Sequence, residues 1–203
     1  QTALQSKHRC PVMMKHLRIS LVIMVQLFTL PSAIAHRYPV SDAGAYILDK
    51  LAGHDIVLTG TVHQHPQILG MMADLLPRLK ENGVTHLALE VASDQQGHID
   101  LFLRTGWGLD RIQLHSAIDC PGYRRLFQVL RGLDPDRRPH VVAIDLPLTQ
   151  YDGAMSRNEY MAARLASIVQ SRSRTSILAM LGGSHVLRKL KWRNRLFKNR
   201  AAI

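Results

Sequence analysis

Two histidines and two carboxylates in this sequence each stand at the end of a short apolar run. His63 follows the run 55–59, Glu90 ends "HLALE", Asp145 ends "HVVAID", and His185 follows "TSILAML" after two glycines and a serine. Imidazole and carboxylate groups serve proteins as general acids, general bases and ligands of divalent metals. The pattern raises the question of which elements could bring four distant segments together.

The four apolar runs are typical of strands buried on both faces of a parallel sheet, because they are continuous rather than alternating. They span 55–59, 85–89, 140–146 and 175–181. Helical patterns lie between them, at 66–80, 93–104, 121–131 and 156–170. Strands that alternate with helices predict an α/β fold, a largely parallel β-sheet flanked by helices.

The carboxyl ends of parallel strands lie at one edge of the sheet, where α/β proteins bind their ligands. We therefore expect His63, Glu90 and His185 to converge in a pocket at this edge. Two kinds of chemistry remain open for them. The three side chains could bind Zn²⁺ or Mn²⁺ and activate water, or His63 could act as a general base without a metal. Asp145 could belong to the same site or cap a turn before Pro147.

Arg157 stands where the helix dipole disfavours a cation, in the first turn of the predicted helix 156–170. This position indicates that Arg157 meets an anion, either Glu90 or a carboxylate of the substrate. We expect Arg157 to face the same pocket, so that Arg157→Ala weakens ligand binding and leaves the thermal midpoint nearly unchanged.

The starts of the helices carry recognisable patterns. Ser93-x-x-Gln96 and Ser156-x-x-Glu159 each predict a capping box, in which the two side chains bond the backbone at the helix start. His65 precedes Pro66, so it could cap the helix 66–80 or serve as a ligand.

The charge of the chain lies at its ends. The formal net charge is +11, but residues 1–35 hold four Lys and Arg, residues 188–200 hold seven, and neither segment has an acidic residue. The remaining 15 basic residues balance all 15 acidic ones (26 − 11 = 15). A nucleic-acid-binding protein usually carries its charge on the folded face, so we expect no nucleic-acid partner.

The N-terminal segment resembles a secretory signal peptide. Lys15 and Arg18 precede the twelve-residue apolar run Ile19–Leu30, and "AIA" follows, ending at Ala35. This arrangement predicts a signal peptide over 1–35, cleaved after Ala35, and export to the periplasm or the exterior. The true start is then Met13 or Met14, and residues 1–12 are upstream sequence.

Several motifs together resemble one superfamily. "GTVH" at 60–63, "LALEVASDQQGHIDLFLRTG" at 87–106, "SRNEYMAARL" at 156–165 and "GGSHV" at 182–186 occur in this order in the ChaN-like haem-binding uptake proteins, the erythromycin esterases and the TIKI/TraB proteins. The chain looks most like ChaN. Thr61 stands where ChaN-like proteins and esterases usually have Glu, as in the TIKI/TraB form.

The resemblance implies a ChaN-like α/β domain over 36–190, export, and non-covalent haem binding linked to iron uptake. The candidate haem-binding residues are His65, Tyr123 and Tyr151. The alternative is a hydrolase that uses His63, Glu90, Arg157 and His185, with a divalent metal or as general acids and bases.

The C-terminal segment 191–203 is expected to be a basic tail. Relatives usually continue beyond this point, so we expect a truncated C-terminus of low local order; contact with a membrane surface stays open. A second copy of the chain also stays open as a partner.

Overall fold

The computed structural model describes residues 42–150, 156–171 and 174–187. The predicted signal peptide, the basic tail and Tyr151 lie outside these ranges. The chain divides into two units, 1–40 and 41–203, and the described residues all belong to the second. Among them, no helix is long and apolar enough to cross a membrane.

Four parallel strands form the sheet, which confirms the predicted α/β fold. They are β1 (Ile56–Thr61), β2 (His86–Ala92), β3 (His140–Asp145) and β4 (Ile177–Gly182), in the order β1-β4-β2-β3. All residues of β2 and β4 are buried, as their continuous apolar sequences predict. The two central strands, β4 and β2, are parallel neighbours, so their carboxyl-terminal ends lie side by side.

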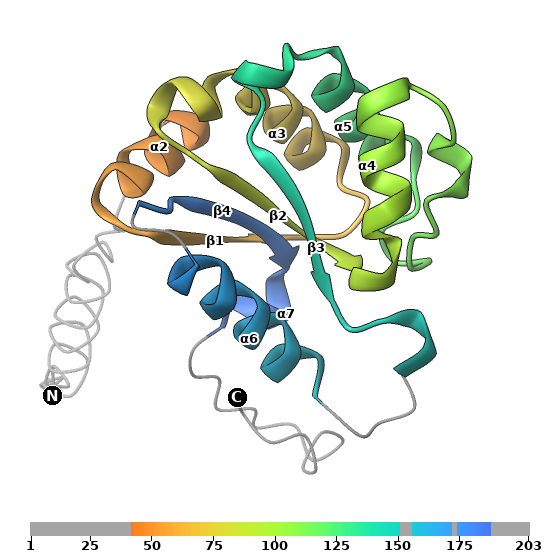
Figure 1. Ribbon diagram of the computed structural model, residues 1–203. Coiled ribbons are helices and arrows are strands. Elements are labelled where there is room, and N and C mark those ends of the chain that lie inside the picture. The colour runs from red at the N-terminus through yellow and green to blue at the C-terminus, as the bar shows by residue number, and fades with distance from the viewer. Residues whose placement is uncertain (1–41, 151–155, 172–173, 188–203) are drawn as a thin grey trace, which may run out of the picture. The chain divides into compact units, whose positions relative to one another are not determined.

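Helices cover both faces of the sheet (Figure 1). On one face lie α2 (Ala43–Gly53), α3 (Pro66–Leu79), α4 (Gln96–Thr105) and α5 (Pro121–Gly132); on the other lie α6 (Arg157–Gln170) and the short α7 (Gly183–Val186). Short 3₁₀ helices span Lys80–Asn82, Ser93–Gln95, Leu109–Arg111, Pro135–Arg137 and Leu148–Gln150. The sequence patterns above do not include α2.

The core consists of two apolar clusters, one on each face of the sheet. Leu178 and Met180 of β4 belong to the larger cluster with α2, α3, α4 and α5, whereas Ile177, Ala179 and Leu181 belong to the smaller one with α6. Alternate residues of one strand thus serve opposite faces, because side chains of a β-strand alternate in direction. This explains why β4 is apolar at every position.

Neither predicted capping box forms. Ser93 begins a 3₁₀ helix, and its hydroxyl lies 2.7 Å from the Tyr160 hydroxyl, whereas Ser156 makes no side-chain cap bond to α6. The Gln96 side chain bonds β3 instead, accepting from Ala143 N–H at 2.7 Å and donating to the Val141 carbonyl at 3.0 Å. Since β3 is an edge strand, tertiary contact gives this amide more favourable partners than the helix start offers.

Candidate active site

Glu90 lies where β2 becomes irregular. Its pairing with β3 shifts register between Leu89 and Ala92. Such bulges change the direction of a side chain and are frequent beside active sites. Here the irregular segment carries a carboxylate that is only 5% exposed, so the carboxylate needs partners inside the protein.

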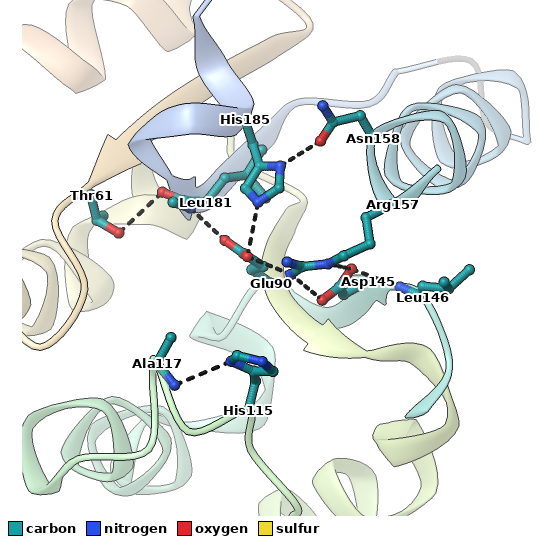
Figure 2. A network of polar contacts seen from close by, with 11 residues as sticks. Thr61, Glu90, His115, Ala117, Asp145, Leu146, Arg157, Asn158, Leu181 and His185 are labelled. Atoms are coloured by element: carbon teal, nitrogen blue, oxygen red, sulfur yellow. Dashed lines mark hydrogen bonds and ion pairs between the residues drawn. The ribbon is translucent and has the colours of Figure 1, made fainter. Parts of the chain in front are cut away.

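Three groups from different elements meet the Glu90 carboxylate (Figure 2). Arg157 Nη2 lies 2.6 Å from Oε1, His185 Nε2 lies 3.3 Å from the same oxygen, and the backbone N–H of Gly182 donates to Oε2. Burial raises the pKa of Glu90, but hydrogen bonds from His185 and Gly182, together with the charges of His185 and Arg157, lower it to about 2. Glu90 is therefore ionised at neutral pH.

Arg157 joins Glu90 to a second buried carboxylate, Asp145. Its Nε lies 3.0 Å from Asp145 Oδ1 and its Nη2 lies 2.5 Å from Oδ2, in the two-pronged arrangement that guanidinium and carboxylate groups favour. Asp145 is 1% exposed and also accepts the N–H of Leu146 at 2.8 Å. The sequence left open whether Arg157 meets Glu90 or a carboxylate of the substrate. In the structure Arg157 bonds Glu90, and Asp145 is a second partner that was not expected.

His63 lies next to this cluster, on the turn after β1. A Cβ placed on Gly182 would lie 2.7 Å from His63 Nε2 and 3.3 Å from Glu90 Oε2, so the imidazole and the carboxylate adjoin the same glycine. The His63 side chain is exposed to solvent. The structure therefore brings His63, Glu90, Arg157 and His185 together at the carboxyl-terminal edge of the sheet, and Gly182 makes room for the ring of His63.

Asn158 is a site residue that the sequence analysis missed. Its Oδ1 contacts Nδ1 of His185, on the opposite side of the ring from Glu90. The available signal was its position directly after Arg157, at the start of a helix that follows a strand. Thr61, by contrast, donates its hydroxyl to the Leu181 carbonyl at 3.1 Å and joins β1 to β4.

Of the three residues considered as haem ligands, the structure describes His65 and Tyr123. His65 is exposed and occupies the N-cap position of α3, without a side-chain cap bond. Tyr123 is 4% exposed, and its hydroxyl has no hydrogen-bond partner among the residues that the structure describes. Burial, with Glu90, Asp145 and Cys120 as further causes, raises the pKa of Tyr123, so the phenol stays protonated. A haem could reach Tyr123 only if the core opened.

A divalent metal finds no ready set of ligands in the part of the chain that the structure describes. Within these ranges no group of three His, Cys, Asp or Glu side chains is arranged to hold a metal ion. Glu90 is instead engaged by Arg157, His185 and Gly182.

Some solved structures of known proteins are similar to this chain in fold. No family model and no curated protein sequence matches the chain. The type III effector HopBA1 is similar over 70% of this chain and 72% of its own, with a TM-score of 0.56 and 14% identity. ChaN of Campylobacter jejuni, whose structure was solved for cofacial haem binding, is similar over 68% and 74%, with a TM-score of 0.49 and 13% identity.

A bacterial protein toxin is similar over 72% of this chain, with a TM-score of 0.49 and 22% identity. The chain spans about a third of the toxin's length, 32%. At these identities, the likeness to HopBA1 shows a shared fold and no more.

Proposed function

We propose that the chain is a small hydrolase that uses acid–base chemistry at the carboxyl-terminal edge of its sheet. The observation that carries this proposal is that one buried carboxylate, Glu90, meets His185, Arg157 and Gly182 N–H beside the solvent-exposed ring of His63. Gly182 adjoins both His63 and Glu90. This arrangement supports an active site and not an ion-pair network that only stabilises the fold. Such a network would not require an exposed imidazole next to it.

The chemistry follows from what each group can donate or accept. His63 is in contact with water, so its ring can take a proton as water attacks an acyl carbon. The water oxygen bonds to that carbon, the bond to the leaving oxygen or nitrogen breaks, and the proton passes from His63 to the leaving group. Arg157 carries a positive charge that can stabilise negative charge developing nearby, and Glu90, with His185 beside it, keeps the guanidinium in place.

Hydrolysis of neutral chromogenic acyl esters, such as p-nitrophenyl acetate, by the purified chain tests this proposal. We expect His63→Gln to lower kcat/KM by about 10²- to 10⁴-fold, the usual contribution of a general base. His98→Gln is the matched control, because His98 is an exposed histidine of α4 away from the site. Equal activity of the two variants would show that His63 is not the base.

Haem binding is a second candidate, and the exposed imidazoles favour it. His63 and His65 flank Gln64, which has a φ of 60°, and Val62 beside them is 67% exposed. Solvent-facing imidazoles next to an apolar side chain could bind the iron and one face of a porphyrin. In this proposal the chain is a ChaN-like exported protein linked to iron uptake, with its haem at the same edge of the sheet.

A haemin titration beside metal analysis of the purified chain distinguishes the candidates. A shifted Soret band that His65→Gln abolishes supports haem binding, and stoichiometric Zn or Mn without a Soret shift supports a metal-dependent hydrolase. N-terminal sequencing of the exported protein tests cleavage after Ala35.

A further inference from the structure

His185 is held at both nitrogens of its ring. Nδ1 contacts Asn158 Oδ1, and Nε2 on the other side lies 3.3 Å from Glu90 Oε1 (Figure 2). The side chain of His185 is 15% exposed, so water supplies few alternative partners. Two oxygen atoms from two different elements thus determine how this imidazole is turned.

The element that carries His185 cannot orient the ring alone. It is α7, with only four residues, Gly183–Val186, and an isolated helix of this length is not stable. The start of α6, by contrast, is firmly attached. Arg157 bonds both Asp145 and Glu90, and Tyr160 contacts the hydroxyl of Ser93 at 2.7 Å. Asn158, between these anchors, offers His185 a fixed acceptor.

We propose that Asn158 is a positioning residue for His185, a role that rests on the hydrolase function proposed above. Its side-chain oxygen accepts a hydrogen bond from Nδ1–H and thereby aims Nε2 at Glu90. A ring held in this way has both nitrogens engaged within the protein. Neither nitrogen of His185 then faces the attacking water, and the role of general base falls to His63.

The opposite orientation of the Asn158 amide would give a different protonation of the His185 ring. If its nitrogen faced His185, the amide would donate to Nδ1, and that ring nitrogen would carry no proton. The two arrangements differ in one hydrogen atom, which nuclear magnetic resonance of ¹⁵N-labelled histidine detects directly.

The experiment compares the wild-type chain with Asn158→Leu, which removes the acceptor, and Asn158→Asp, which keeps an acceptor oxygen. Asn82→Leu is the matched control, since Asn82 is exposed and its side-chain amide donates to the backbone carbonyl of Arg78, four residues earlier. The His185 signals are assigned with His185→Gln. We expect a Nδ1–H signal in the wild type, the Asp variant and the control, and its loss in the Leu variant.

Kinetics with p-nitrophenyl acetate give the second measurement. We expect Asn158→Leu to lower kcat by up to about 100-fold, because a displaced His185 ring shifts the groups that it contacts in the site. KM should stay within about twofold of the wild-type value, because Asn158 contacts His185 rather than the ester.

The two proposals fail separately. A wild-type His185 without a proton on Nδ1 overturns the role of Asn158, even if the Leu variant does not fold. A Nδ1–H signal that persists in Asn158→Leu overturns it as well. A wild-type chain that hydrolyses no ester while showing the Nδ1–H signal refutes the hydrolase function and leaves the orientation of the ring established.

Discussion

Replacing Arg157 by Ala should strongly destabilise the fold. The side chains of Asp145 and Glu90 are 1% and 6% exposed, and each loses its contact with the guanidinium. Asp145 loses more, since both of its oxygens bond Arg157. It keeps the N–H of Leu146, whereas Glu90 keeps Gly182 N–H and His185. Removing one partner of a buried ion pair costs about 3–5 kcal/mol, because the remaining carboxylates lose the opposite charge that offset their burial.

This magnitude changes the expectation from the sequence, where an Arg157 that faces only a ligand would leave the thermal midpoint nearly unchanged. Total stability of a domain is about 5–15 kcal/mol, so the variant should lose a large part of it. The midpoint should fall on the order of 10 °C. Urea unfolding followed by circular dichroism measures the change in free energy, and differential scanning fluorimetry measures the midpoint.

Two further variants make the test specific. Arg125→Ala removes an exposed arginine of α5 and should change the free energy of unfolding by less than about 0.5 kcal/mol. Arg157→Lys keeps the charge but loses the two-pronged contact, so an intermediate loss is expected. If Arg157→Ala were no less stable than Arg125→Ala, the ion-pair account of the site would be refuted.

Three other predictions concern Glu90, Gly182 and Gln96. Because the pKa of Glu90 is lowered from 4.5 to about 2, its ionisation stabilises the fold by up to about 3 kcal/mol above pH 4.5, and this is lost as the pH falls towards 2. Urea unfolding at several pH values should show the loss, and Glu90→Gln should abolish it. Gly182→Ala places a methyl group against His63, so kcat/KM for ester hydrolysis should fall about 100-fold; an unchanged rate would show that the ring position is unimportant. Gln96→Ala leaves two backbone groups of β3 unpaired and should cost about 1–3 kcal/mol in urea unfolding, whereas the exposed Gln128→Ala should cost almost nothing.

The fold could be predicted from the sequence because its strongest signals are local. A continuous apolar run such as 175–181 fits a strand buried on both faces, and the structure places β4 at Ile177–Gly182. The convergence of His63, Glu90 and His185 could also be predicted, because parallel strands share one carboxyl-terminal edge. The helix α2 was missed. Its first turn is capped by Asp42, whose carboxylate accepts the N–H of Gly44 at 2.8 Å, which is a local signal that could have been used.

The α/β class, most of the elements and the edge at which the candidate site residues meet could thus be predicted from patterns along the chain. The pairing of the polar groups could not, because it depends on tertiary contacts. Glu90 bonds residues 67 and 92 positions away, and Gln96 bonds β3 rather than its own helix start. The physical reason is that a hydrogen bond requires two groups within about 3 Å in a suitable direction. The order β1-β4-β2-β3 and the packing of α6 set those distances, and no local pattern encodes them.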